Sequence, residues 1–402
     1  MSPPPTIQSG QARARPAELS VPAYGRSSLS DLLPSLMGTL GVAGYDDVLD
    51  LTPALIGVRR VILLLVDGLG ELNLAAQPTI APALAAMASP RGPVDASSPS
   101  TTPVSLASLT TGLPPGEHGI VGFTVAIPGT ERLLTHIDWH EDPPPRQWQP
   151  APTAFEILAR SGVAVRAAGP GRFIGSGLSD AIYWGASPRP VISPGDLVSR
   201  ALVAAKDGER SLSYAYHGEL DMTGHVRGCN SDAWKFQLAQ VDAMVASILS
   251  ELPVDTALVV TADHGMLDVA DADKIDIDAS GDEPGAETAL GLAAGVRLVA
   301  GEPRARYVYT EPGAAPDVLA AWTALLGPRA WVLCRDEAIA HGLFGSAVRS
   351  AHVGRIGDVV AWACGNSAIT ASRREPGAHS LIGYHGSLTR VELAVPVRIG
   401  RA

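Results

Sequence analysis

Hydrophobic residues form several short, uninterrupted runs along the chain. The densest is Arg59–Val66, whose Val-Ile-Leu-Leu-Leu-Val stops at Asp67-Gly68. Three more runs follow at Val163–Ala168, Leu212–His217 and Thr256–Thr261. Apolar runs without alternation are typical of strands that are buried on both faces of a parallel sheet. The pattern therefore predicts a buried, mostly parallel sheet.

Helical segments fit between and around these runs. They are predicted at 29–40, 73–87, 193–205 and 231–252. Strands that alternate with helices indicate an α/β layer fold. We therefore expect a mostly parallel central sheet with helices on both faces.

Two stretches lie outside this alternation in the first half of the chain. Residues 1–20 are rich in Pro, Ser and Gln and are expected to form a flexible arm ahead of one domain over 21–402. Residues 124–152 include Pro143-Pro-Pro-Arg-Gln-Trp and are predicted to form a long surface loop or hairpin.

Residues 266–380 are less regular than the rest. They contain an acidic, Gly/Pro-rich stretch at 268–287 and possible strands at 304–309, 330–334 and 358–363. We interpret this region as an insertion, or smaller subdomain, that could also cover a ligand site. We find no internal repeat.

The composition is that of a globular protein. Of 402 residues, 46% are hydrophobic and 18% are charged, and the mean hydropathy is +0.16. A formal net charge of −11 and a pI near 5.4 argue against a groove that binds a nucleic-acid polymer. Small anionic substrates stay compatible with this charge, because bound cations can reverse the local field.

Cysteine usage and the N-terminal residues bear on the compartment. Cys229, Cys334 and Cys364 show neither a disulfide framework nor the spacing of a zinc knuckle, which favours a reducing environment. The first ten residues lack the features of a signal peptide, and no stretch approaches about 18 uninterrupted apolar residues. We therefore expect a soluble cytoplasmic protein without a membrane partner.

The segment Ser98–Gly112 predicts a helix with Thr102 at its start. Thr102 stands directly before Pro103, and small and apolar residues continue to Gly112. Threonine is a favoured N-cap, proline a favoured first helical residue and glycine a favoured end. The Thr102 hydroxyl is therefore expected among unpaired backbone N–H groups, where a phosphate binds well. Taken alone, the segment is more simply a capped helix without a ligand.

Polar side chains follow the predicted strands. Asp67 ends one apolar run, and Asp263-His264 ends another. Ligand sites in open α/β sheets lie beyond the carboxyl ends of the strands. Asp221 and His225 follow a third run and are four residues apart, so a helical turn would place both on one side. His385 lies between two glycine-flanked turns near the C-terminus.

Each of these features also has a simpler interpretation. An Asp-Gly pair after a strand is usually a turn. Single histidines such as His341, His352 and His379 are more often hydrogen-bonded or exposed residues than ligands. His136 and His140 are also four apart, but their Pro-rich surroundings favour a solvated loop.

The combination of these residues changes the interpretation. Three carboxylates, three imidazoles and one hydroxyl suit two borderline divalent cations, zinc above all. In chain order the candidates are Asp67, Thr102, Asp221, His225, Asp263, His264 and His385.

Longer motifs surround the candidates and follow one order over roughly 60 to 386. They are Val66-Asp67-Gly68, Thr101-Thr102-Pro103, Thr111-Gly-Leu-Pro-Pro-Gly-Glu-His-Gly-Ile-Val121, Glu219-Leu-Asp221 with Gly224-His225, Thr261-Ala-Asp263-His264-Gly-Met266, and His385-Gly386. This set resembles the nucleotide pyrophosphatase/phosphodiesterase branch of the alkaline phosphatase superfamily. The set as a whole is specific, although no single motif is.

The resemblance implies an alkaline phosphatase-like catalytic domain with two zinc sites. The ion that binds the phosphate and the entering water would be held by Asp221, His225 and His385. The other ion would be held by Asp67, Asp263, His264 and the oxygen of Thr102.

Metal coordination explains how a threonine can serve as nucleophile. Its alkoxide is scarcely populated near neutral pH, and a bound cation lowers the pKa of the hydroxyl. We therefore predict that Thr102 attacks phosphorus in a small phosphorylated substrate. Water would then hydrolyse a phospho-threonine intermediate, so that a phosphodiester or phosphoanhydride bond is cleaved.

The chain departs from the family pattern beside the nucleophile. Members that act on nucleotides usually have Phe-Pro-Asn after it, and an Asn shortly after His-Gly-Ile-Val that helps to hold a phosphoryl oxygen. Here Pro103 follows at once, and Phe123 occupies the Asn position with Thr124 beside it. Thr124 could substitute through its hydroxyl. Trp139, Trp148 and Phe123 could stack on a leaving group, although packing is the simpler role.

Other functions stay open at this point. A phosphomonoesterase or phosphonate hydrolase could use the same metals, with Arg172 or Arg227 neutralising the extra charge. A metal-stabilised scaffold is the non-enzymatic alternative, which would not need Thr102. The missing Cys/Ser-x-Pro-x-Arg motif argues against a sulfatase, and the lack of a spanning helix argues against a lipid-head transferase.

Overall fold

A six-stranded sheet lies at the centre of the larger part of the molecule. The computed structural model describes residues 14–140 and 142–401. The strand order is β18 (Arg398–Arg401), β8 (Thr256–Thr261), β1 (Arg60–Val66), β7 (Ser211–His217), β5 (Ala164–Pro170) and β6 (Ser187–Val191). All neighbours run parallel except β18, which pairs antiparallel with β8. The predicted mostly parallel sheet is confirmed.

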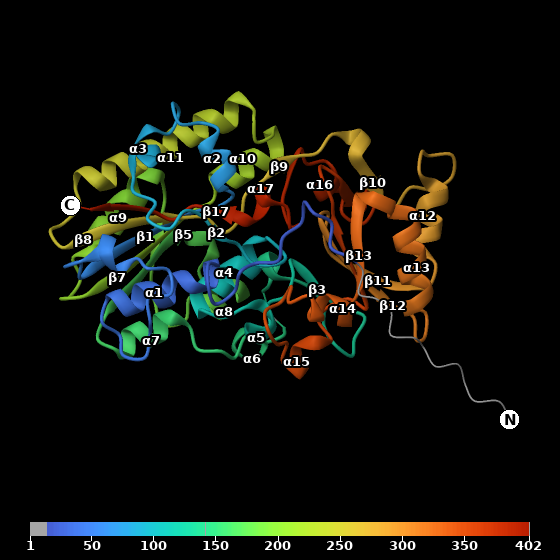
Figure 1. Ribbon diagram of the computed structural model, residues 1–402, viewed down its shortest axis with the longest axis horizontal. Coiled ribbons are helices and arrows are strands. Elements are labelled where there is room, and N and C mark those ends of the chain that lie inside the picture. The colour runs from blue at the N-terminus through green and yellow to red at the C-terminus, as the bar shows by residue number, and fades with distance from the viewer. Residues whose placement is uncertain (1–13, 141, 402) are drawn as a thin grey trace.

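Helices cover both faces of this sheet (Figure 1). On one side lie α3 (Pro82–Ala86), α9 (Pro194–Ala205) and α11 (Asp232–Ser250), and on the other α1 (Leu32–Thr39), α4 (Thr102–Thr111), α7 (Ala154–Arg160) and α8 (Gly177–Ile182). The predicted α/β layers are therefore confirmed. Within the described ranges, no helix is both long and apolar enough to cross a membrane.

Burial explains the unbroken apolar sequences of the central strands. Every residue of β8 is buried, and so are residues 61–66 of β1, because neighbouring strands and helices cover both strands. The edge strand β6 has the sequence Ser-Pro-Arg-Pro-Val and is partly exposed. Its prolines suit an edge, where backbone donors are not all needed. The apolar pattern consequently did not predict β6.

One predicted helix is wrong as a single element. Residues 73–87 contain two short helices, α2 (Glu71–Ala75) and α3, instead of one. Pro78 and Pro82 interrupt the segment, since proline lacks a backbone N–H and its ring clashes with the preceding turn. The helices predicted at 29–40, 193–205 and 231–252 are confirmed as α1, α9 and α11.

A second, antiparallel sheet of four strands forms the smaller part, on the right of Figure 1. Its order is β11 (Val296–Glu302), β12 (Ala305–Thr310), β14 (Val359–Ala363) and β13 (Ala330–Cys334). Residues of this sheet and of α12 (Ala286–Ala293) and α13 (Ala315–Leu326) share a hydrophobic cluster of their own. The three strands predicted within 266–380 are confirmed, whereas the limits of the subdomain stay a prediction.

Short strand pairs and helices complete the two parts. The pairs are β2 (Val94–Asp95) with β17 (Ala394–Val395), β3 (Thr124–Ala126) with β4 (Leu133–Thr135), β9 (Leu267–Asp268) with β16 (Gly383–Tyr384), and β10 (Lys274–Asp276) with β15 (Ala368–Thr370). The short helices are α5 (Pro115–His118), α6 (Pro145–Trp148), α14 (Arg335–Ala340), α15 (Ser350–Val353), α16 (Pro376–His379) and α17 (Arg390–Leu393).

The hairpin predicted within 124–152 is present, but the region is not confined to the surface. Trp139 and Trp148 are 1% and 5% exposed, so both are core residues. The expectation that His136 lies in a solvated loop is wrong. Its ring is buried, and its Nε2 accepts a hydrogen bond from Trp148 Nε1 at 3.0 Å. The two indole rings pack against each other, and this packing places the segment in the core. The apolar pattern of the sequence does not predict this contact.

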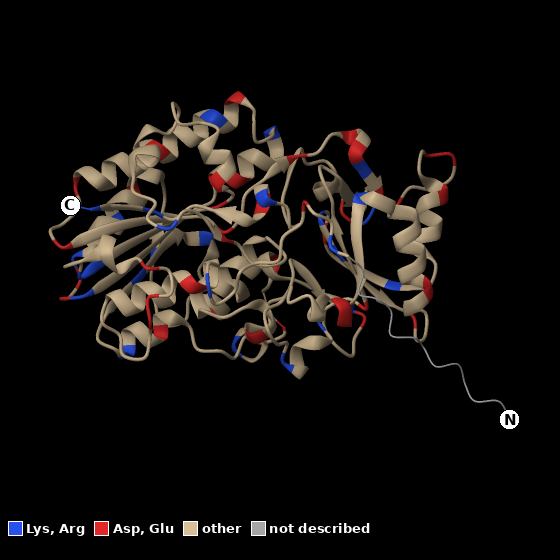
Figure 2. Cartoon of the chain, in the orientation of Figure 1, with Lys and Arg blue, Asp and Glu red and all other residues tan. Residues whose placement is uncertain are grey.

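A buried ion pair connects the smaller sheet to the C-terminal segment. Basic and acidic residues are otherwise interspersed over both parts (Figure 2). The Arg304 guanidinium binds the Glu392 carboxylate at 2.6 and 2.9 Å, and both side chains are fully buried. Arg304 also donates to the carbonyl groups of Gly365 and Ser367. The chain after β11 is therefore fastened to α17.

We expect Glu392→Ala to lower the free energy of unfolding by about 3–5 kcal/mol, because it leaves the Arg304 guanidinium buried without its counter-ion. Denaturant titration measures the loss. Asp142→Ala is a matched control, since the Arg132–Asp142 pair is exposed and worth about 0–1 kcal/mol. Equal effects of the two variants would contradict this role for the buried pair.

Candidate metal centre

The ends of three parallel strands bring the predicted polar residues together. Asp67 directly follows β1, and Asp263 and His264 lie just beyond β8. Helix α10 (Glu219–Arg227) begins just after β7 and carries Asp221 and His225 one turn apart, so the predicted helical turn is confirmed. Because β7, β1 and β8 are parallel neighbours, these residues share one edge of the sheet.

His385 reaches the same edge from the far end of the sequence. It follows β16, and its ring stacks on the ring of His264 with centroids 3.7 Å apart. Its centroid lies 5.0 Å from that of His225. Side chains that are scattered over more than three hundred positions of the sequence thus meet at one place.

A glycine permits the closest approach within this cluster. Gly68, directly after Asp67, has φ +73°, a conformation that residues with a Cβ rarely adopt. A Cβ at this position would lie 3.0 Å from both Cα and Cβ of Asp221. The Asp-Gly turn therefore lets the end of β1 lie against α10.

Thr102 lies beside this cluster, at the start of α4. Its Oγ1 is 3.2 Å from His264 Nε2 and 3.4 Å from Asp67 Oδ1. The prediction that Thr102 is the N-cap is wrong by one residue. Thr101 is the cap, because its carbonyl accepts the first helical hydrogen bond, from Ser105 N–H, and Thr102 is already helical. The helix ends at Gly112, in the left-handed conformation, as predicted.

The candidate ligand atoms form two overlapping groups. Atoms of Asp221, His225 and His385 lie within 4.8 Å of one another, and so do atoms of Asp67, Asp221 and His264. Each group has a donor set that zinc and similar cations accept. Asp263 lies next to the second group, with its Oδ2 3.5 Å from His264 Nε2. Asp221 belongs to both groups.

The three imidazoles are held with one nitrogen free for a cation. In each ring Nδ1 lies within hydrogen-bond distance of a backbone carbonyl oxygen and can donate to it. The acceptors are Gly383 O for His225 (2.8 Å), Gly265 O for His264 (3.2 Å) and Ser100 O for His385 (3.0 Å). This arrangement fixes the tautomer in which Nε2 has a lone pair, as in metal-ligating histidines.

Buried carboxylate oxygens without a partner also fit a bound cation. Within the described part of the chain, Asp221 Oδ1 and Asp263 Oδ2 are buried and accept no hydrogen bond. The other oxygen of Asp263 accepts from the backbone N–H groups of Gly68 and His264 at 3.1 Å. Buried acceptors of this kind are costly unless a cation or donor satisfies them. The residues therefore fit divalent metal ions.

The pKa shifts in the metal-free cluster also fit bound cations. Burial, together with the nearby carboxylates of Asp263 and Asp221, raises the pKa of Asp67 well above its ordinary range. Burial and the neighbouring His264 and His225 rings lower the pKa of His385 well below its ordinary range. Bound cations would favour the ionised carboxylate and are compatible with the neutral ring.

Tyr216 is a member of the site that the sequence analysis missed. It lies on β7, beside Leu65 of β1, and its hydroxyl donates a short hydrogen bond to Asp67 Oδ2. Asp67 Oδ1 is thereby left to face Thr102 and His264. The strand register that pairs β1 with β7 is the only signal for this contact, and it cannot be read before the sheet order is known.

We expect Tyr216→Phe to weaken metal binding about 10- to 100-fold, because it removes the group that orients Asp67. Chelator competition on the purified protein measures the change. Tyr183→Phe removes the hydroxyl of a half-buried tyrosine that bonds to Tyr214 instead, and serves as the matched control. Unchanged affinity in Tyr216→Phe would show that Asp67 needs no such support.

Glu302 is the second residue that the sequence analysis missed. It ends β11 of the smaller sheet, and its Oε2 lies 3.5 Å from His385 Nδ1. Burial raises the pKa of its carboxyl well above the ordinary range. Nothing in Gly301-Glu302-Pro303 distinguishes it from a surface turn in the sequence.

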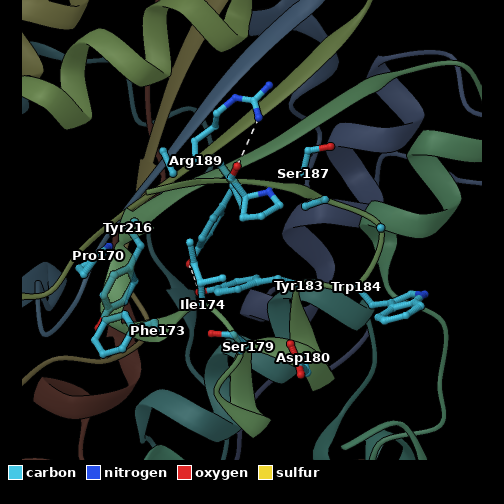
Figure 3. Close-up of a pocket in the computed structure, with 18 residues that line it drawn as sticks. Pro170, Phe173, Ile174, Ser179, Asp180, Tyr183, Trp184, Ser187, Arg189 and Tyr216 are labelled. Carbon is cyan, nitrogen blue, oxygen red and sulfur yellow. Dashed lines mark hydrogen bonds between the residues drawn. The ribbon is translucent and has the colours of Figure 1, made fainter. Parts of the chain in front are cut away.

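A pocket of about 520 Å³ opens beside the centre. Its wall runs from Tyr216 and Phe173, whose rings are 5.9 Å apart, to Trp184 at the opposite end (Figure 3). Phe173, Ile174 and Trp184 are 36%, 49% and 52% exposed, so apolar surface faces the opening. The pocket is suited to an apolar or aromatic group.

Phe123 and Thr124, the residues predicted to contact substrate, form hydrogen bonds within the hairpin region. Thr124 Oγ1 bonds to Thr135 Oγ1 across the hairpin at 3.0 Å, and the Phe123 carbonyl accepts from the His136 backbone. The hydrogen bonds of the described residues do not join either of them to Thr102. Their role in holding a phosphoryl oxygen stays a prediction.

The fold is of the alkaline phosphatase type, and the ends of its strands carry a cluster of candidate metal ligands. Residues 61–388 match the family "Type I phosphodiesterase / nucleotide pyrophosphatase". Because this match extends over most of the chain, the protein belongs to that family of metal-dependent hydrolases. A search of curated protein sequences found no match.

Solved structures of two kinds resemble the chain. Murine ectonucleotide pyrophosphatase/phosphodiesterase 5 has a TM-score of 0.67 and 20% identity, over 85% of this chain and 88% of that one. Phosphonoacetate hydrolase from Sinorhizobium meliloti, in complex with phosphonoacetate, has a TM-score of 0.63 and 20% identity, over 86% and 90%. At these identities the likeness establishes the fold.

Proposed function

We propose that the protein hydrolyses phosphodiester or phosphoanhydride bonds of small phosphorylated molecules, with two Zn²⁺ ions and Thr102 as the nucleophile. The observation that carries this proposal is the position of the Thr102 hydroxyl, in the first turn of α4 and 3.2 Å from His264 Nε2. A helix N-terminus presents backbone N–H groups that stabilise charge on phosphoryl oxygens.

Each of the two groups of ligands would hold one metal ion. One ion would be held by Asp221, His225 and His385, and the other by Asp67, Asp263, His264 and the Thr102 oxygen. Metal ions bound here would lower the pKa of the hydroxyl and stabilise the charge on the phosphoryl group. Thr102 Oγ1 would form a bond to phosphorus as the bond to the leaving oxygen breaks. Water would then cleave the phospho-threonine.

The pocket beside Tyr216 supports an organic ester group as part of the substrate. Tyr216 lines this pocket and its hydroxyl bonds to Asp67, so we expect the substituent of a phosphate at Thr102 to occupy the pocket. An inactive variant of murine ectonucleotide pyrophosphatase/phosphodiesterase 5 is among the solved structures, in complex with AMP. A nucleoside is therefore one candidate for this group.

We expect Phe173→Ala to raise KM for an aryl diester about 3- to 10-fold with little change in kcat, because aromatic contacts are worth about 0.5–1.5 kcal/mol. Steady-state kinetics give both constants. Ile56→Ala removes an exposed apolar side chain beyond the opposite end of β1 and is the control. A matching rise in the control would argue against a substrate contact at Phe173.

Hydrolysis of a phosphomonoester or phosphonate is the second candidate, since phosphonoacetate hydrolase shares the fold. Such substrates have an extra negative charge that an arginine or lysine usually neutralises. Among the described residues, no Lys or Arg forms an ion pair with Asp67, Asp221 or Asp263. Arg172 is exposed and lies over the Phe173 ring, and Arg227 is exposed on α10. Arg172 thus lies beside the pocket wall, and the substrate panel below distinguishes the diester from the monoester.

A substrate panel on zinc-loaded protein tests the proposal. It compares a dinucleotide or NDP-sugar, bis(p-nitrophenyl) phosphate, p-nitrophenyl phosphate and phosphonoacetate, each with and without EDTA. We expect the diester or anhydride to have the highest kcat/KM and EDTA to abolish turnover. Preference for the monoester or phosphonate would establish the second candidate. Tight metal binding without any turnover would favour a metal-stabilised scaffold.

A further inference from the structure

The smaller sheet places Glu302 against the metal centre. The residue is 6% exposed, and its Oε2 lies 3.5 Å from His385 Nδ1. The seven candidate ligands follow strands of the central sheet, begin or line its helices, or come from the C-terminal segment. Glu302 comes instead from β11, so its carboxyl is where the second sheet reaches the centre.

The backbone around Glu302 holds the carboxyl in place. Glu302 pairs with Ala305 at the closed end of the β11–β12 hairpin. Gly301 precedes it with φ +80°, and a Cβ there would lie 2.0 Å from Ala305 O, so the hairpin is tight. On the other side of the turn, Arg304 is fastened to Glu392. The position of Glu302 is therefore set by two independent constraints.

The Glu302 carboxyl lies between a candidate ligand and the nucleophile segment. His385 Nδ1 donates to Ser100 O at 3.0 Å, and Glu302 Oε2 lies near the same N–H. Within the described residues, the Thr101 hydroxyl and Glu302 Oε1 are both buried and neither has a hydrogen-bond partner. A Cβ on Gly386 would lie 2.7 Å from Glu302 Cδ, so the turn after His385 is shaped to accept this side chain.

We propose that Glu302 is a positioning residue, which orients His385 for metal binding. This inference rests on the proposed function, because it treats His385 as a metal ligand. A carboxyl group next to Nδ1 supports the tautomer in which Nε2 faces the metal, and loss of such a partner typically costs 10- to 100-fold in metal affinity or activity. The smaller sheet thereby helps to set the geometry of the centre.

Variants at Glu302 test this role by two readouts besides turnover. Glu302→Met keeps the length of the side chain without an oxygen, Glu302→Ala removes the bulk, and Glu302→Gln keeps an acceptor. We expect Met and Ala to weaken Zn²⁺ binding about 10- to 100-fold in chelator competition, and to alter the visible absorption of the Co²⁺-substituted protein. The Zn²⁺ affinity of Glu302→Gln should stay within a few-fold of the wild-type affinity. Loss of activity should be in kcat more than in KM.

Asp358→Ala is the matched control, because it breaks an ion pair with Arg335 in the same sheet, at the end of the hairpin away from Glu302. It should lower the melting temperature but leave metal affinity unchanged. Wild-type metal affinity and Co²⁺ spectrum in Glu302→Met would overturn the inference alone. Equal losses in Asp358→Ala would overturn it too, as an effect of general stability. A wild-type protein that binds neither metal would overturn the proposed function and this inference together.

Discussion

Replacing Thr102 with alanine is expected to abolish turnover while both metal ions stay bound. The variant removes the one oxygen that we propose attacks phosphorus, and leaves all three carboxylates and all three imidazoles of the centre. Loss of a nucleophile typically lowers kcat by several orders of magnitude, so a decrease of about 10⁴-fold or more is expected. Steady-state kinetics and metal analysis of the same preparation measure both quantities.

The intermediate can be observed directly. Acid quench of the wild-type enzyme during turnover, followed by peptide mass spectrometry, should find a phosphate on the peptide that contains Thr102, and Thr102→Ala should lack it. Thr110→Ala is the matched control, since this residue lies in the last turn of α4 and its hydroxyl bonds to Leu106 O. Full activity in Thr102→Ala with intact metal content would rule out the proposed nucleophile.

The sequence was sufficient to predict the central strands and the polar residues that follow them. Runs such as Val61–Val66 are apolar because both faces of the strand are buried, so burial and sequence carry the same information. Asp67 and Asp263 then stand where each run stops. Parallel strands place such residues at one edge. That rule accounts for the carboxylates at the strand ends, whereas Thr102 and His385 joined the predicted site through the combination of motifs and the family resemblance.

The missed residues depend on relationships between elements that local pattern does not contain. Tyr216 contacts Asp67 only because β7 lies beside β1 in parallel register. Glu302 reaches His385 only because a separate sheet packs against the C-terminal segment. The burial of His136 likewise depends on Trp148. Each contact is set by tertiary packing, and neither composition nor periodicity predicts it.

Metal removal is expected to destabilise the protein more as the pH rises from 3.8 toward the raised pKa of Asp67. In the metal-free protein, burial and the carboxylates of Asp263 and Asp221 raise the pKa of Asp67 above its ordinary 3.8. Between these two pKa values the folded state binds more protons than the unfolded state, so the free energy of unfolding falls as pH rises. The pKa of His385 is shifted in the opposite direction, below its ordinary 6.5. This residue therefore lowers the free energy of unfolding only when the pH falls below 6.5.

A bound cation replaces the proton on Asp67, so the metal-loaded protein avoids this loss. Each ion at a thousand times its Kd adds about 4 kcal/mol to the free energy of unfolding. The difference in melting temperature between zinc-loaded and EDTA-treated protein should therefore widen with rising pH up to the raised pKa of Asp67, and then level off.

The variant Asp67→Asn isolates the contribution of the Asp67 carboxylate to this pH dependence. Without its charge, the metal-free variant should lose much of the pH dependence, and zinc should stabilise it less than it stabilises the wild type. The amide keeps the size of the side chain and an oxygen that can accept from Tyr216. A difference in melting temperature that stays constant with pH in the wild type would mean that Asp67 is already ionised without metal. In that case, repulsion between the carboxylates at the strand ends would not be the reason why a cation stabilises the protein.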